Sequence, residues 1–176
     1  MKVGDILIAL CSLARTGWML RGVPSSIAEN VAQHLFIAAI IAYELSVEAR
    51  SLGFQVNPER AAAIALTHDL AEAVVGDITR RAGIGEAKEL AEHKAYSMLD
   101  ISDDIKKLYE EYRSESSMEA VIARISDGLA TYLKAKFYIN LGYRVDDIAR
   151  SSLETALQLA TKAGLRHVVE RFLNRL

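Results

Sequence analysis

Hydrophobic residues recur at intervals of three and four along almost the whole chain, without the apolar and polar alternation of a half-buried strand. Proline, which interrupts helices, occurs at only two positions, 24 and 58. This pattern predicts an all-α protein, a compact bundle of about seven or eight helices in a single domain over residues 1–176. The expected helices cover residues 2–15, 26–52, 58–76, 86–99, 103–112, 117–141, 145–163 and 165–175.

The start and stop signals of the second and third helices are the clearest in the chain. Ser26 and Glu29 have the spacing of a capping box, so we expect the second helix to begin there. Pro58 suits the first turn of the third helix, and Gly76 is expected to end it. The segment 18–25, before the second helix, is rich in unusual side chains and is expected to be a functional loop.

Composition limits the class of protein and of ligand. A chain of 176 residues with 51% hydrophobic and 25% charged residues is long enough to bury a core. A net charge of −2 without a basic run argues against a nucleic-acid polymer as partner and favours small ligands. The apolar run 35–43 is too short to span a membrane, so we predict no membrane segment. The single cysteine, Cys11, is expected to be a reduced core thiol, which favours a cytoplasmic location.

An imidazole and two carboxylates lie close together in the apolar third helix. His68, Asp69 and Glu72 fall within about 100° of one another on a helical wheel, because each residue turns the helix by about that angle. Burying such groups costs several kcal/mol unless they are paired or bind a metal. Neutral imidazole together with carboxylate is an ordinary ligand set for a divalent cation. The sequence therefore predicts half of a metal site here.

His34 falls on the core-facing stripe of the second predicted helix. Alone it would be interpreted as a core histidine satisfied by a neighbouring acceptor, but a second histidine on a neighbouring helix favours a shared metal. Asp127 is the best carboxylate for a further ligand, although its position is equally compatible with a solvated side chain. The two other histidines, His93 and His167, have charged neighbours and are expected to be exposed.

Several longer motifs carry a resemblance to a known family. The order His34, His68-Asp69, Asp127 resembles the ligands of the HD-domain metal-dependent phosphohydrolases. The chain is most similar to the HD-domain 5′-deoxynucleotidases in the segments 15–18, 21–24, 29–34, 68–72 and 76–79, and the likeness extends over about residues 15–138. Gln33 departs from the pattern, because many relatives carry an acidic residue directly before the first metal histidine.

The resemblance implies an HD-type helical fold and an activity. That activity is the metal-dependent hydrolysis of deoxyribonucleoside 5′-monophosphates to deoxynucleoside and phosphate, by a homodimer. The implied cofactor is one divalent ion: manganese, cobalt, nickel, iron, zinc or magnesium. The implied metal ligands are His34, His68, Asp69 and Asp127, and the residues that handle protons are Glu72 and Asp77.

The substrate phosphate requires donors besides the metal. The cationic candidates are Arg15, Arg21, Lys94, Arg80 and Arg81. We expect Arg80 and Arg81 to cap a helix end or to stay solvated, which leaves Arg15 as the strongest candidate. Trp18, the single tryptophan, is expected either to pack against the deoxyribose and exclude a 2′-hydroxyl or to be a core anchor.

Two other interpretations remain open from the sequence. One is an HD phosphohydrolase that acts on a nucleoside triphosphate, a cyclic nucleotide or another small phosphomonoester. The other is a non-catalytic helical nucleotide-binding protein in which the metal only holds helices together. A structural metal site needs no spare acids around it. Glu72 as a plain helix-surface carboxylate and Asp77 as a cap after Gly76 would favour that second alternative.

Overall fold

A computed structural model describes residues 1–79 and 83–175. Over these residues the protein is all-α, as predicted, with no β-strand and two isolated bridges, between Lys2 and Asp100 and between Ala14 and Asn30. The helices are α1 (Val3–Ser12), α2 (Thr16–Met19), α3 (Val31–Ser51), α4 (Pro58–Thr67), α5 (Glu72–Val75), α6 (Gly85–Met98), α7 (Asp103–Ser114), α8 (Met118–Asn140), α9 (Asp146–Lys162) and α10 (Arg166–Leu173). All but the four-residue helix α2 lie within helices expected from the sequence, and α4 and α5 share one of them, the helix predicted over 58–76.

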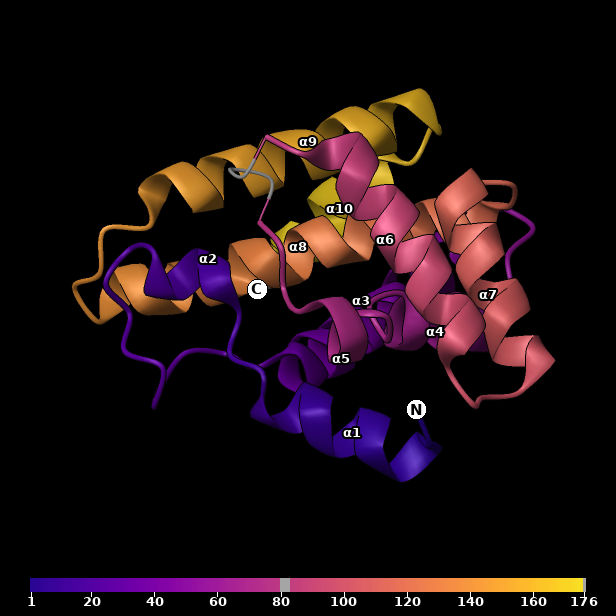
Figure 1. Ribbon diagram of the computed structural model, residues 1–176. Helices are drawn as coiled ribbons and strands as arrows, with labels where there is room; N and C mark the ends of the chain where they lie inside the picture. Colours follow the sequence, from indigo (N-terminus) through magenta and orange to yellow (C-terminus); the bar gives the residue numbers. More distant parts are fainter. Residues whose placement is uncertain (80–82, 176) are drawn as a thin grey trace.

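The core is built around the two longest helices, α3 and α8. Figure 1 shows α8 running beside α9, and α8 also packs against α3 and α4. Gly128 allows the close approach of α8 and α9, since a Cβ atom there would lie 3.2 Å from both the Ala156 Cβ and the Ser152 carbonyl oxygen. Asp127, the residue before Gly128, contacts His34 of α3.

The predicted start of the second helix is wrong. α3 begins at Val31, and the capping box is formed by Asn30 and Gln33, whose side chains each accept a hydrogen bond from the other's backbone N–H at 3.1 and 2.8 Å. Glu29 is instead fully buried, and Ser26 is exposed before the helix. Gln33 therefore has a local structural role at the start of α3.

The third predicted helix is interrupted where its functional residues lie. α4 ends at Thr67 and α5 begins at Glu72, with a tight turn between them. The Tyr96 hydroxyl of α6 donates a hydrogen bond to the Thr67 carbonyl and accepts one from the Leu70 backbone N–H at 3.2 Å. These bonds replace those of a continuous helix, so a contact from a distant segment overrides the local helical periodicity.

Helix α1 presents one face to the core and the other to solvent. Ile6 and Leu10, four residues apart, are buried, whereas Leu7 and Ile8 are exposed. Cys11 is also exposed, so the prediction of a core thiol is wrong. An apolar sequence neighbourhood did not reveal which face of this helix turns inward.

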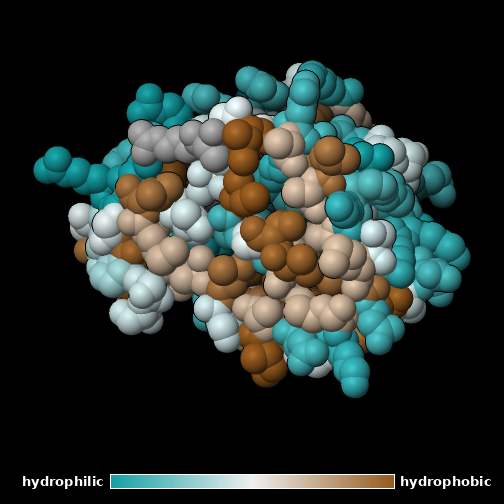
Figure 2. Space-filling view, in the orientation of Figure 1, coloured by the Kyte–Doolittle hydropathy of each residue, from teal (hydrophilic) through white to brown (hydrophobic). Residues whose placement is uncertain are grey.

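Figure 2 shows hydrophobic side chains gathered over the middle of the viewed face, around α5, within a more polar surrounding.

Helix α3 has the length and composition of a membrane span, with 21 residues and a mean hydropathy of 1.3 in its most apolar window. Half of that window is buried within the protein, where α3 packs against α4 and α8. Its burial is that of a core helix, and by its length and composition it is the sole candidate span in the described part of the chain.

Candidate active site

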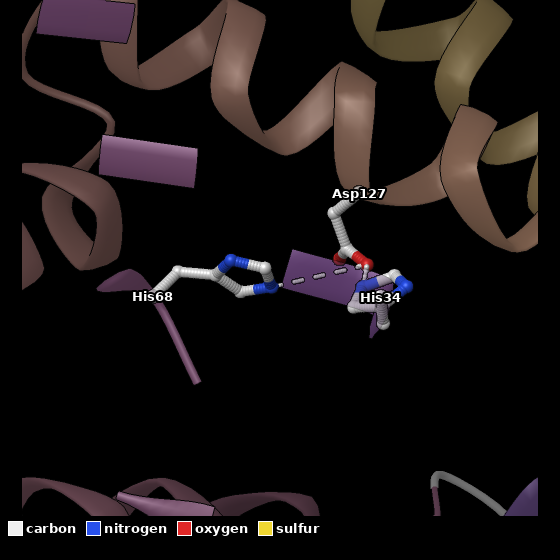
Figure 3. A group of neighbouring side chains, drawn as sticks. All are labelled: His34, His68 and Asp127. Atoms are coloured by element: carbon white, nitrogen blue, oxygen red, sulfur yellow. Dashed lines mark hydrogen bonds and ion pairs between the residues drawn. The ribbon is translucent and has the colours of Figure 1, made fainter. Parts of the chain in front are cut away.

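Three side chains from three helical segments meet at one point (Figure 3). His34 comes from α3, His68 from the end of α4, and Asp127 from the middle of α8. The Oδ1 atom of Asp127 lies 3.0 Å from His34 Nε2 and 4.0 Å from His68 Nε2. Their nearest ligand atoms all lie within 4.8 Å of one another. Residues 93 positions apart in sequence thus form one buried cluster, as the metal hypothesis required.

The tautomer of His68 is determined by the turn that follows α4. Its Nδ1 atom lies 2.7 Å from the Ala65 carbonyl oxygen, which can only accept, so Nδ1 carries the proton that it donates. Nε2 therefore faces the cluster with its lone pair when the ring is neutral. This nitrogen is buried and has no hydrogen-bond partner among the described residues, although Asp69 Oδ2 lies 3.2 Å away. A buried, unpartnered nitrogen that points at carboxylates is typical of a metal ligand.

The cluster fits a divalent metal. Nitrogen and oxygen ligands lie about 2.0–2.2 Å from such ions, so two donors to one ion are at most about 4.4 Å apart. The three imidazole–carboxylate distances, 3.0, 4.0 and 3.2 Å, satisfy this limit, and the ligand atoms of the whole cluster lie within 4.8 Å of one another. Two imidazoles and the carboxylates of Asp69 and Asp127 form a mixed nitrogen and oxygen set that suits several first-row metals. Three of the four ligands predicted from the sequence form this cluster, and the carboxylate of the fourth, Asp69, lies 3.2 Å from His68 Nε2.

The cluster opens into a cavity of about 580 Å³, within the usual size range of small-molecule sites. Its wall includes Arg15, Trp18, Arg21, Glu72, Asp77, Lys88, Tyr112, Arg124 and one face of α9. The Nη1 atom of Arg15 is buried and has no hydrogen-bond partner among the described residues. Burial lowers the pKa of Arg15, but nearby carboxylates, led by Glu29 and Asp127, outweigh this effect and raise it. Arg15 therefore keeps its positive charge, and its Nη1 is available to donate a hydrogen bond to a ligand.

Glu72 is 3% exposed and lines the cavity, so it is not a helix-surface carboxylate. Burial and the neighbouring charges of Asp69 and Asp77 raise its pKa well above the ordinary value of a glutamate. Lys88 Nζ of α6 lies 3.7 Å from its Oε1 and partly offsets this effect. The raised pKa favours the protonated form of Glu72.

Asp77 and Trp18 both line the cavity, and both have structural partners as well. The Asp77 carboxylate accepts a hydrogen bond from the Thr16 backbone N–H and so holds the start of α2, rather than capping its own helix after Gly76. The Trp18 ring is buried, and its Nε1 donates to Glu29 Oε2 at 3.1 Å. These contacts attach the segment containing Arg15 and Trp18 to the rest of the site.

The structure brings some predicted phosphate contacts to the cavity and not others. Arg21 lines it, but its guanidinium is paired with Asp147 of α9. Lys94 is exposed and lies outside the cavity wall, where Lys88 of the same helix lies instead. The register of α6 decides between these two lysines, and the sequence pattern did not reveal it.

The remaining basic and histidine residues fall into two groups. Arg80 and Arg81 lie outside the described residues. His93 and His167 are exposed, as predicted, and His93 lies 3.1 Å from Glu110.

Sequence reasoning missed Tyr112, which lies at the centre of the site. Its ring centroid is 4.7 Å from that of His68, and its hydroxyl donates to Asp127 Oδ2 at 3.3 Å. Burial, with Asp127 nearby, raises the pKa of Tyr112 well above its usual value, so the hydroxyl remains a donor. No sequence signal marks it, because a tyrosine on an amphipathic helix is an ordinary core residue.

The family model of the HD domain matches residues 9–166, nearly the whole chain. The chain belongs to the HD-domain family. The dipeptide His68-Asp69, in the turn after α4, lies within the matched residues, as do His34 of α3 and Asp127 of α8. His34, His68 and Asp127 are called the HD-domain cluster below.

Individual HD-domain relatives have moderate sequence identity to this chain. The 5′-deoxynucleotidase HDDC2 of Homo sapiens is 31% identical over 137 residues, which are 74% of this chain and 63% of the human one. A 5′-deoxynucleotidase of Klebsiella pneumoniae is 27% identical over 155 residues, 82% of this chain and 78% of that one. The crystal structure of a Pyrococcus horikoshii protein aligns with a TM-score of 0.83 at 31% identity, covering 98% of this chain and 96% of that chain. The matched part of this chain thus corresponds to less than two thirds of the length of the human 5′-deoxynucleotidase.

Metal binding to the HD-domain cluster is expected to be strongly pH-dependent. Burial lowers the pKa of His68, but Asp69, Asp127 and the Ala65 carbonyl outweigh it and raise the pKa to about 9. A metal ion binds only the neutral imidazole, so it must displace this proton below that pH. Affinity should therefore rise with pH up to about 9 and then level off. Calorimetry of metal-free protein with Mn²⁺, in buffers of different ionisation enthalpy, should detect proton release at pH 7; an affinity independent of pH from 6 to 9 would contradict the expectation.

Proposed function

We propose that this HD-domain protein is a metal-dependent phosphomonoesterase that hydrolyses deoxyribonucleoside 5′-monophosphates to deoxynucleoside and inorganic phosphate. The observation that carries the proposal is that His68, Asp69 and Asp127 line a cavity whose wall also contains a buried acid, Glu72, and Arg15, whose Nη1 has no hydrogen-bond partner among the described residues. A metal that only held helices together would need neither of them. The 5′-deoxynucleotidase relatives support the substrate class.

One divalent ion is the cofactor in this proposal, held by His34, His68, Asp69 and Asp127. When bound, such an ion activates water and offsets the negative charge that accumulates on phosphoryl oxygens. Manganese, cobalt, nickel, iron, zinc and magnesium are the candidates, and mixed nitrogen and oxygen ligands favour the transition metals among them.

Arg15 and Lys88 are the groups that would bind the phosphate dianion. The free Nη1 of Arg15 is buried in the cavity wall, so its charge is little screened by solvent. Lys88 also lines the cavity and adds a second cation, with its Nζ 3.7 Å from Glu72 Oε1 and 3.3 Å from Glu92 Oε1. Arg21 becomes a third phosphate ligand in this proposal only when its pair with Asp147 opens.

Glu72 and Asp77 are the proposed proton carriers. As a water oxygen bonds to phosphorus, Asp77 takes the proton that the water loses. As the bond between phosphorus and the 5′ oxygen breaks, Glu72 gives its proton to that oxygen, and the nucleoside leaves as an alcohol. The raised pKa of Glu72 supports its assignment as the acid.

The experiment that tests the function is a phosphate-release assay on metal-stripped protein. Each of the six ions is added separately, with the four deoxyribonucleoside 5′-monophosphates and their ribose counterparts as substrates. We expect phosphate release only with an added ion, and faster release from the deoxy compounds. Metal-loaded protein that releases phosphate from none of these nucleotides would contradict the proposal. The homodimer and the cytoplasmic location remain predictions.

Trp18 is expected to determine the choice between deoxyribose and ribose. Its buried indole lines the cavity and is fixed by Glu29, so it forms a rigid wall against the sugar. Trp18→Phe should leave room for a 2′-hydroxyl and raise kcat/KM for ribonucleotides more than it lowers that for deoxynucleotides. The measurement is the ratio of the two kcat/KM values for the same base. Equal losses on both substrates would instead identify Trp18 as a core anchor alone.

A further inference from the structure

The two oxygens of the Asp127 carboxylate have different neighbours. Oδ1 faces the histidines, 3.0 Å from His34 Nε2 and 4.0 Å from His68 Nε2. Oδ2 points the other way and accepts a hydrogen bond from the Tyr112 hydroxyl at 3.3 Å. A carboxylate rotates easily about its last bond, so something must hold Oδ1 toward the imidazoles if it is to be a metal ligand. Tyr112 is the group in contact with the opposite oxygen.

The ring of Tyr112 contacts both His68 and Arg124. The centroids of the Tyr112 and His68 rings lie 4.7 Å apart, and their planes are tilted by 36°. The Arg124 guanidinium carbon lies 4.5 Å from the ring centroid, and Arg124 Nη2 donates to the Tyr112 carbonyl at 3.3 Å. Arg124 is in turn paired with Glu115, its Nε lying 3.0 Å from Oε1. The ring therefore has little freedom to turn its hydroxyl away from Asp127.

We propose that Tyr112 is a positioning residue that presents Oδ1 of Asp127 and the ring of His68 to the metal. The inference rests on the metal centre of the proposed function. Through its hydroxyl Tyr112 orients one ligand, and through its ring it supports another, so a single residue of α7 links ligands on α8 and at the end of α4. Loss of a residue that orients a metal ligand commonly lowers the affinity for the metal by about 10-fold to 100-fold.

The test compares Tyr112→Phe with Tyr132→Phe in metal-free protein. Tyr112→Phe keeps the ring and removes only the hydroxyl. Tyr132 lies on the same helix as Asp127, outside the cavity wall, and none of the hydrogen bonds among the described residues involves its hydroxyl. We expect the Kd for Mn²⁺, measured by calorimetry, to rise about tenfold or more in Tyr112→Phe and to stay unchanged in Tyr132→Phe. The visible absorption spectrum of bound Co²⁺ should change only in the first variant.

Thermal melting of the metal-free proteins separates positioning from a general loss of stability, because a lower Tm alone leaves the Kd of the folded protein unchanged. Arg124→Met provides a second variant with the hydroxyl intact, and a smaller rise in Kd is expected from the looser ring. A Kd and a Co²⁺ spectrum like those of the unmodified protein in Tyr112→Phe would overturn the inference. Failure of the unmodified protein to bind either ion would instead refute the metal centre itself.

Discussion

Replacing Asp127 with alanine is expected to remove the bound metal and nearly all phosphate release. The carboxylate is the shared neighbour of both histidines, so its loss removes a ligand and half of the negative charge that attracts the cation. Catalytic metals contribute several kcal/mol to transition-state stabilisation, and each 1.4 kcal/mol is a factor of ten in rate, so kcat/KM should fall on the order of 10³-fold or more. Metal content is measured by mass spectrometry after loading with Mn²⁺, and activity by phosphate release.

Asp104→Ala is the matched control for this substitution. Its side chain is 88% exposed on α7, where its contact is with Lys107, so both metal content and activity should be unaffected. Asp127→Asn keeps the shape of the side chain and can still accept a hydrogen bond, but an amide oxygen is a poorer metal ligand than a carboxylate. A lower affinity for Mn²⁺ is therefore expected in this variant too. Full metal content in Asp127→Ala would show that the ion, if bound, lies elsewhere.

Replacing Glu72 with glutamine is expected to lower turnover while leaving metal content intact. Glutamine has the size of glutamate but no acidic proton to give to the leaving oxygen. Proton transfer by a positioned side chain accounts for about 10²–10⁴-fold in rate, so kcat should fall within that range with little change in KM. Because Glu72 is buried in the cavity wall and not among the three clustered ligands, the Mn²⁺ content should equal that of the unmodified protein.

Glu89→Gln is the control for this prediction, since Glu89 is an exposed acid on α6 and should tolerate the change. The pH profile supplies a second readout. The loss of an acid removes the limb of the kcat profile on which activity falls as pH rises. Turnover unchanged in Glu72→Gln would refute the assignment of Glu72 as proton donor, whatever its metal content.

The sequence was most informative where ionisable side chains fall on apolar helix faces that are expected to be buried. Two histidines on apolar helix faces, with carboxylates in an apolar run, require compensation for the cost of burial, and that requirement alone indicated a metal. It correctly joined His34, His68 and Asp127 into one cluster. It failed for Cys11 and Lys94, because the inward face of a helix depends on its neighbours rather than on the composition of the segment. It also failed for the capping box, since a buried Glu29 pairs with Trp18 instead of capping a helix.

By itself, then, the sequence determined the all-helical class, the approximate extent of the longer helices and the two histidines of the cluster, because periodicity and the energetic cost of buried charge are local properties. The tertiary structure alone decided the break between α4 and α5, the choice of Lys88 over Lys94 and the place of Tyr112 behind Asp127. Each of these depends on a contact between segments far apart in the chain. The Tyr96 hydroxyl replaces helical hydrogen bonds at the break, and no pattern within one helix encodes the atom that arrives from another.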